Sequence, residues 1–142
     1  MTRETVYAAL FAKASTAAGL QTASRRIKLW SDVPAAKQPA LFQVEKHQIV
    51  NQQRGRPAKY FLHAELYLYV NAGNNPDAVS SILLNNMLDA IEATLAPDDP
   101  MRTVCTLGGT VSHCWISGTI ETDEGALGAQ AVAIIPIEIM IG

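Results

Sequence analysis

The stretch YFLHAELYLYVN, residues 60–71, alternates at every second position between two kinds of side chain. One set is apolar and consists of Tyr60, Leu62, Ala64, Leu66, Leu68 and Val70. The other set is amphipathic and consists of Phe61, His63, Glu65, Tyr67 and Tyr69. Because successive side chains of a strand point to opposite faces, this pattern predicts a β-strand with one face in a core.

The run AVAIIPIEIMI, residues 131–141, predicts a second long strand that begins at about residue 130. Its single charge is Glu138, so the strand is apolar on both faces and is expected inside the sheet, covered on both sides. Helices can cover one face, and either a loop or a neighbouring subunit the other. Pro136 has no N–H, so pairing is expected to break there on one side.

Two amphipathic helices are predicted around these strands. The first follows Thr2 as its N-cap and ends by Gly19. The second follows Asn75 as its N-cap and extends to about Leu95. Its apolar stripe includes Val79, Ile82, Leu83, Met87 and Ile91, with Leu84 and Leu88 beside it.

Three further strands are predicted at residues 23–30, 40–50 and 111–122. The element order is therefore α-β-β-β-α-β-β. It indicates an α+β fold with a single central, mostly antiparallel β-sheet and two main helices packed on it. No linker or repeat interrupts residues 1–142, so a single domain is expected.

The composition narrows the class of protein. Hydrophobic residues make up 49% and charged residues 17%, and the charged share is below the usual quarter. Such a domain either buries its sheet faces unusually well or covers part of its surface with partners. The net charge of −2 gives no indication of DNA or anionic lipid as a general partner.

The sequence contains neither a targeting signal nor a disulfide framework. The N-terminal residues lack the apolar core of a signal peptide. The apolar run at the C-terminus is shorter than the roughly 20 residues of a membrane helix. Cys105 and Cys114 do not make a disulfide framework, so both are expected to be reduced in a cytosolic protein.

No pattern for catalysis, metal or cofactor binding is found. The histidines His47, His63 and His113 stand at no ligand spacing to one another or to the cysteines. Cys114 is adjacent to His113 on a predicted strand, so the two side chains point to opposite faces. Gly108 and Gly109 are not followed by the Lys-Ser/Thr of a phosphate loop. We therefore expect no catalytic residue, no metal ion and no cofactor.

Two surfaces are candidates for partners. A basic cluster of Arg54, Arg56 and Lys59 occupies the polar loop of residues 51–59. It is either a solvated hairpin tip or a contact for phosphate or for acidic groups of a partner. The aromatic strand face of Phe61, Tyr67 and Tyr69 lies either under a helix or in an interface, where aromatic residues concentrate.

Three segments carry a resemblance to a known family: KYFLHAELYLYV (59–70), LLNNMLDAIEATLAPDDP (83–100) and TLGGTVSHCWISGTIETDEGALGAQAVAIIPIEI (106–139). With them the chain resembles the tail-terminator (tail-completion) proteins of long-tailed bacteriophages over roughly residues 41–139. The resemblance implies a compact fold with a central sheet and a homohexameric ring on the end of the tail tube. Such a ring stops tube growth, joins the head-completion protein and lets DNA pass through its lumen.

On this interpretation the partners are other copies of the chain, the tail tube protein and the head-completion or neck protein. DNA is only a transient passenger, no membrane is involved, and the protein is located at the neck end of the virion tail after assembly in the host cytoplasm. Candidate interface residues are Phe61, Tyr67, Tyr69, Leu84 and Leu88, with the alternative that these side chains form the core of one subunit.

Other functions stay open at this point. The chain is either a tail terminator, another neck or head-completion component, or a small α+β ligand-binding domain or enzyme with an unrecognised pocket.

Overall fold

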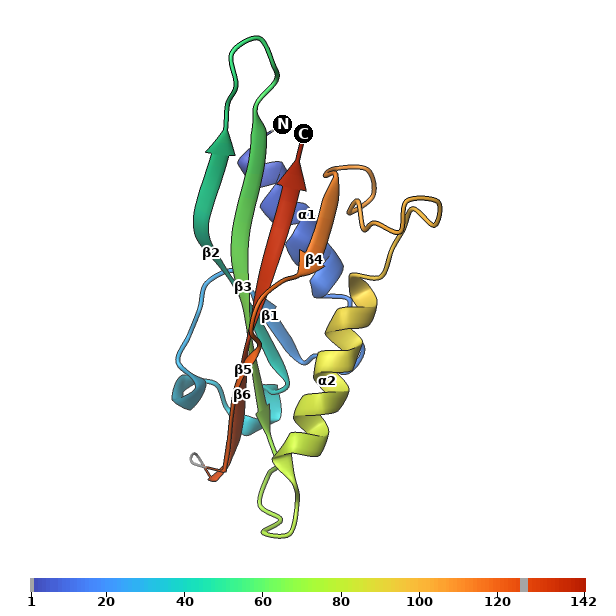
Figure 1. Ribbon diagram of the computed structural model, residues 1–142. Coiled ribbons are helices and arrows are strands. Elements are labelled where there is room, and N and C mark those ends of the chain that lie inside the picture. The colour runs from blue at the N-terminus through green and yellow to red at the C-terminus, as the bar shows by residue number, and fades with distance from the viewer. Residues whose placement is uncertain (1, 126–127) are drawn as a thin grey trace.

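The structure is a computed structural model that describes residues 2–125 and 128–142. Two helices lie against a long, twisted β-sheet (Figure 1), which confirms the predicted α+β fold. The helices are α1 (Arg3–Ala14) and α2 (Ser80–Thr94). The strands are β1 (Thr22–Ser24), β2 (Ala40–Asn51), β3 (Lys59–Asn71), β4 (His113–Ile116), β5 (Glu121–Gly125) and β6 (Gly128–Ile141).

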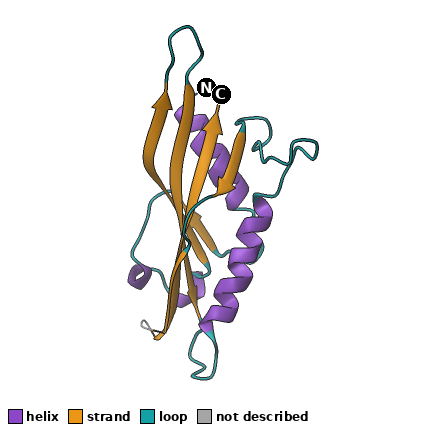
Figure 2. Cartoon of the chain, viewed as in Figure 1, coloured by secondary structure: helices purple, strands orange, loops and turns teal. Residues whose placement is uncertain are grey.

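The sheet is organised around the pair of β3 and β6. These two strands are antiparallel and stay in register from Tyr60 opposite Ile141 to Asn71 opposite Gln130. The strand order is β1-β2-β3-β6-β4, and β5 also pairs with β6. Only β1 runs parallel to its neighbour, β2, among the described pairs. The long strands extend along most of the molecule in Figure 2, and β6 is interior, as predicted.

Pro136 interrupts the pairing on one side of β6. The prediction of one strand over residues 111–122 is wrong, because β4 ends at Ile116 and β5 begins at Glu121. Between them the Ser117 N–H donates to the Pro136 carbonyl oxygen at 3.1 Å. Proline has no N–H to donate in return. The ladder therefore breaks at Pro136, as expected from the sequence.

The core lies between the two helices and one face of the sheet. Residues of β3 and β6 that face the helices are fully buried, including Leu62, Leu66, Leu68, Ile135, Ile137 and Ile139. On α1 the buried residues are Val6, Tyr7, Leu10 and Ala14. The Thr2 hydroxyl accepts a hydrogen bond from the Thr5 N–H at 3.3 Å, so the predicted N-cap is confirmed. The helix ends before Gly19, whose positive φ of 92° belongs to the following turn.

Helix α2 differs from its prediction in start and phase. It begins at Ser80, because the Asn75 side chain accepts from the Asp77 N–H at 3.0 Å and closes a local turn instead of capping the helix. The buried stripe is Ser80, Leu84, Met87 and Ile91. Leu84 is thus central to the core, and Val79, Ile82 and Leu83 are exposed.

Residues 25–39 form a connection in place of the predicted strand at 23–30. Only Thr22–Ser24 pairs with β2. The connection then makes two short 3-10 turns, Trp30–Asp32 and Ala35–Lys37. It crosses the face of the sheet opposite the helices, where Val33 is buried with Ala40, Phe42 and Tyr69 in a second, smaller core. This segment is a loop cover for part of the second face of the sheet.

Candidate interaction surfaces

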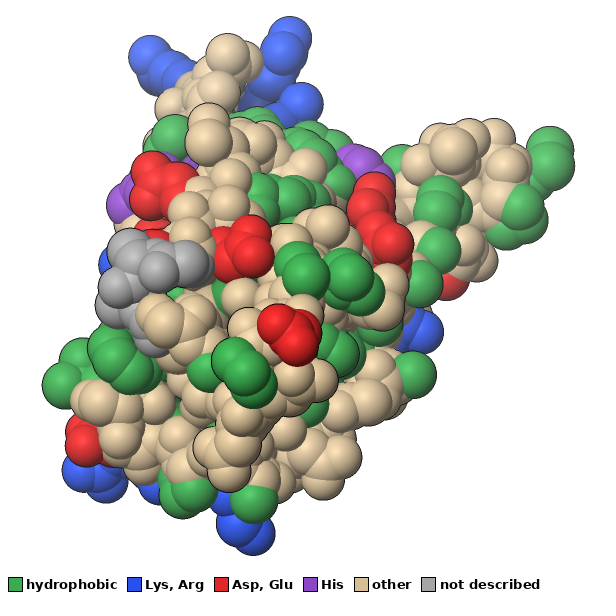
Figure 3. Space-filling view, turned by 90° about the horizontal axis from the view of Figure 1, so that it is seen from below, with side chains coloured by type: hydrophobic (Ala, Val, Ile, Leu, Met, Phe, Trp, Pro, Cys, Tyr) green, Lys and Arg blue, Asp and Glu red, His purple; other side chains and the backbone are tan. Residues whose placement is uncertain are grey.

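Charges of opposite sign gather in different parts of the surface. Seen from the end at which α2 begins (Figure 3), most Lys and Arg side chains lie at two opposite margins, and Asp and Glu side chains lie between them. Hydrophobic side chains are visible around the acidic ones. Such surfaces, with charged and hydrophobic side chains side by side, are candidates for contact with another protein.

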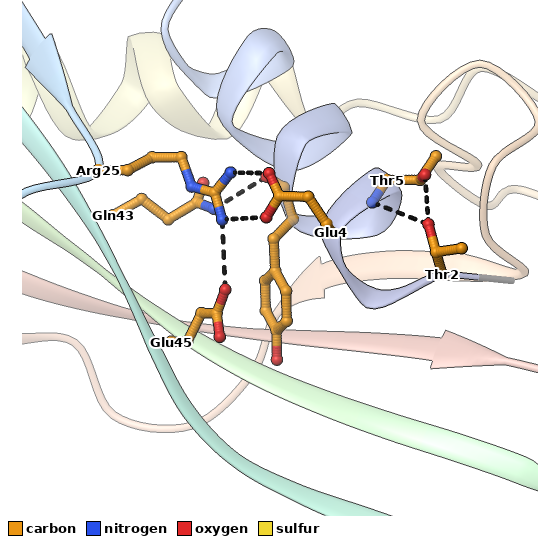
Figure 4. Close-up of polar contacts among 7 residues, drawn as sticks. Thr2, Glu4, Thr5, Arg25, Gln43 and Glu45 are labelled. Atoms are coloured by element: carbon orange, nitrogen blue, oxygen red, sulfur yellow. Dashed lines mark hydrogen bonds and ion pairs between the residues drawn. The ribbon is translucent and has the colours of Figure 1, made fainter.

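The connection of residues 25–39 is anchored by Arg25. Its guanidinium donates to the Glu4 carboxylate at 2.6 and 2.9 Å and to Glu45 Oε1 at 3.2 Å (Figure 4). It therefore links the start of the connection to α1 and β2. The hydrogen bonds from Arg25 lower the pKa of Glu4 below its usual value.

Tyr69 fixes the next part of the same connection. Its hydroxyl donates to the Lys28 carbonyl oxygen at 2.7 Å, and its ring contacts Phe42 with centroids 5.3 Å apart. Only 4% of Tyr69 is exposed, and burial raises the pKa of its phenol. The side chain thus belongs to the interior of a single copy and is not free for a partner.

An apolar cavity of about 340 Å³ opens beside Tyr69. We call it the loop pocket, and its lining is Ile27, Lys28, Leu29, Trp30, Tyr67, Tyr69 and Val132. Leu29 is 69% exposed, Ile27 is 44% exposed and Trp30 is 37% exposed. Large apolar side chains around an open cavity indicate a docking surface. Sequence reasoning missed it, because the prediction for residues 23–30 is a strand.

A second apolar surface lies on the other side of the sheet, on the first turns of α2. We call it the helix patch, and it consists of Val79, Ile82 and Leu83, of which Ile82 is 58% exposed. Its predicted neighbours differ from it: Leu84 is 2% exposed, and Leu88 is half-buried against the core. The exposed apolar side of α2 is therefore the helix patch.

The five predicted interface residues thus differ in how far they are buried within one chain. Tyr69 and Leu84 are buried within one chain. The half-buried residues are Phe61, Tyr67 and Leu88. Tyr67 lines the loop pocket, which keeps part of the aromatic face accessible.

Two histidines lie together on the sheet face opposite the helices, in the half that the connection of residues 25–39 does not cover. The rings of His47 and His63 stack with centroids 4.0 Å apart, and His63 Nε2 lies 3.4 Å from Glu138 Oε2. His113 is elsewhere, stacked on Trp115, and its Nδ1 accepts from the Cys105 N–H at 3.1 Å. Within residues 2–125 and 128–142, no three metal-binding side chains converge.

The loop with Gly108 and Gly109 is organised by an acidic side chain. The Asp98 carboxylate accepts from the Thr106 N–H at 2.7 Å, the Thr106 hydroxyl at 2.9 Å and the Gly108 N–H at 3.0 Å. These hydrogen bonds lower the pKa of Asp98. The backbone N–H groups of Thr106 and Gly108 are therefore already bound to a carboxylate, and the Gly109 N–H donates to the Thr106 hydroxyl oxygen at 2.9 Å.

The basic cluster lies on the hairpin between β2 and β3. Arg54, Arg56 and Lys59 are all exposed, and the hairpin projects beyond the sheet at the end opposite the start of α2 (Figure 1). Arg56 donates to the Gln53 side chain at 3.3 Å. An open cavity of about 290 Å³ is lined by Arg56, Lys59, neighbouring residues of the hairpin and Gly142.

Comparisons with known proteins are informative about the fold only. No protein-family model matches the chain, and no curated protein does. Among solved structures, 23 chains are similar. One of them covers 100% of this chain and 96% of its own length, with a TM-score of 0.51 and 18% identity, and its name describes no activity. In the described residues, no helix is both long and apolar enough to cross a bilayer.

Proposed function

We propose that this chain is a structural virion protein that forms a ring on the end of a phage tail tube, ends tube polymerisation and provides the surface for joining the head or neck. One observation carries the proposal. Two different apolar surfaces, the loop pocket and the helix patch, stay exposed on opposite sides of the sheet. A ring needs such a pair, because each subunit presents one surface to one neighbour and a different surface to the other.

The size of the molecule is compatible with this arrangement. Stable contacts bury about 800 Å² on each partner, so a ring subunit with two contacts would bury about 1,600 Å². This is about a fifth of the 8059 Å² that one copy exposes. The exposed Leu29, Trp30 and Ile82 side chains would supply the apolar centre of that contact.

The hairpin favours a separate role for the basic cluster. The hairpin that carries Arg54, Arg56 and Lys59 projects along the strand direction, whereas the loop pocket and the helix patch lie on lateral sides. In a ring whose axis follows the strands, the hairpin would point along that axis to the tail tube or the neck protein. DNA would pass only transiently through the lumen, which suits a chain of net charge −2.

The experiment is a tail-assembly reaction with and without this chain. Without it we expect tubes that exceed the normal length and do not accept heads, and adding the purified chain should restore both properties. Tails of normal length with full head attachment in its absence would reject the proposal.

A second arm tests the hairpin. A chain with R54Q, R56Q and K59Q should fold normally, because these side chains are exposed, and should form rings but terminate tubes less efficiently. Electron micrographs of particles labelled for this chain then distinguish a ring at the tube end from another neck position.

A further inference from the structure

Basic side chains lie in and beside the loop pocket: Lys28 is part of its lining, and Lys37 lines an adjoining cavity together with Lys28. Arg26, Lys28 and Lys37 are exposed on the connection of residues 25–39, which has Asp32 as its only acidic residue. Arg25 is already paired with Glu4 and Glu45. The other three cations form no ion pair with the residues that the structure describes. The pocket therefore combines an apolar wall with unneutralised positive charge.

The surroundings of the helix patch are acidic. Asp77, Asp89 and Glu92 are exposed, and residues 60–101 contain no Lys or Arg. Asp89 lies seven residues after Ile82 and so two turns further along the same side of α2. Within the described part of the chain, none of the three carboxylates forms an ion pair.

We infer that the helix patch of one copy docks in the loop pocket of the next copy, with Asp77, Asp89 and Glu92 facing Arg26, Lys28 and Lys37. The inference rests on the proposed ring and names the surfaces that form it. Charge complementarity selects a second copy of this chain as the occupant, because the chain carries both halves of an apolar contact with opposite charge.

Symmetric pairing is disfavoured by the same charges. Two loop pockets face to face would bring Lys28 and Lys37 of both copies together, and two helix patches would bring the carboxylates together. Like charges across an interface reject that arrangement. The contact is therefore head-to-tail. The segments that carry the two surfaces, the connection of residues 25–39 and the start of α2, both lie toward the end of the sheet at which α2 begins (Figure 1). Neighbours are therefore related mainly by rotation, as a closed ring requires.

Directed disulfide formation tests the contact. We would prepare L29C and I82C as single variants and as one double variant, and oxidise each at high protein concentration. Cys105 and Cys114 are buried and free, and burial raises the pKa of both thiols, so the native cysteines should not react.

A head-to-tail contact has a distinctive pattern of products. Neither single variant alone should cross-link, an equal mixture should give dimers and nothing larger, and the double variant should give a ladder that ends at the closed ring. The matched control is I49C mixed with L29C, because Ile49 is also exposed but lies on β2 outside both surfaces. Efficient dimers of either single variant, or a mixture that gives no dimer, would overturn the inference.

Charge reversal gives a second measurement. K28E and D89K should each raise the dissociation constant of the assembly about tenfold, and the two changes combined in one chain should restore most of the affinity. Light scattering measures assembly, and circular dichroism confirms that each variant is folded. If neither single variant loses affinity, the proposed contact is contradicted.

The outcomes separate this inference from the proposed function. Cross-links between positions 29 and 82 in a protein that leaves tail length unchanged would retain the contact and reject the terminator role. Rings that terminate tails but do not cross-link at these positions would retain the role and reject the contact.

Discussion

Leu84 and Ile82 are two residues apart on α2 and have opposite environments. Leu84 is fully packed in the core, whereas Ile82 is exposed in the helix patch. We expect L84A to lower the free energy of unfolding by about 2–5 kcal/mol, because it leaves a cavity. We expect I82A to change it by less than about 0.5 kcal/mol.

Urea denaturation of both variants measures the difference. Equal losses would contradict the burial described for the two side chains. The exposed variant then becomes a clean probe of assembly, since its monomer is intact.

Asp98 is expected to make the free energy of unfolding depend on pH in the acid range. Its folded pKa lies below the ordinary value of 3.8, because Gly108 and Thr106 donate to the carboxylate. The unfolded chain therefore binds the proton more readily. The contribution of the ionised Asp98 to the free energy of unfolding is fully present above the unfolded pKa. It is lost as the pH falls from the unfolded pKa through the lower folded pKa.

The variant D98N removes this dependence. At neutral pH we expect it to cost about 0.5–1 kcal/mol, at the low end for lost hydrogen bonds because the carboxylate is exposed. Thermal unfolding of the native chain and D98N should converge as the medium becomes strongly acidic. A constant difference between them at every pH would contradict the assignment.

The break between β4 and β5 depends on a glycine as well as on Pro136. Gly118 has a φ of 111°, a conformation that side chains with a Cβ rarely adopt. A Cβ there would lie 3.5 Å from Pro136 Cγ, which is ordinary contact, so the cost comes from the backbone. We expect G118A to lower the free energy of unfolding by about 1–2 kcal/mol.

The neighbouring exposed Thr119 provides the control for this turn. T119A introduces no backbone strain at its own position. It should therefore leave the free energy of unfolding nearly unchanged when both variants are compared by chemical denaturation. A neutral G118A would show that the turn can relax without its glycine.

Strand β6 supports the sheet from its interior. Its last part pairs with β3 and with β4, and it places Ile137 and Ile139 in the core. A chain truncated after Ile135 should therefore lose its cooperative unfolding transition, because β4 and half of β3 lose their partner. Circular dichroism during heating measures this loss.

Shortening the hairpin provides the contrast for that truncation. Removal of residues 53–56 deletes exposed residues of the tip, so the cooperative transition should remain. A truncated chain that still unfolds cooperatively would contradict the central position of β6.

Local patterns in the sequence were sufficient to predict much of the fold of this chain. The period of two predicted β3, and the run of isoleucines predicted β6 as an interior strand. Thr2 predicted the start of α1, and Pro136 predicted the break in pairing. Each of these features depends on residues within a few positions of one another, and their backbone and hydrogen-bonding properties act locally.

Packing between distant segments decided the remainder. The phase of α2 follows from how Leu84, Met87 and Ile91 meet the sheet, although Ile82 and Leu83 are equally apolar. The connection of residues 25–39 could have continued as a strand, but Arg25 binds Glu4 and Glu45, and Val33 packs near Tyr69. Which apolar side chains stay exposed is therefore a property of the folded chain, because a side chain is buried only by partners that the fold brings to it.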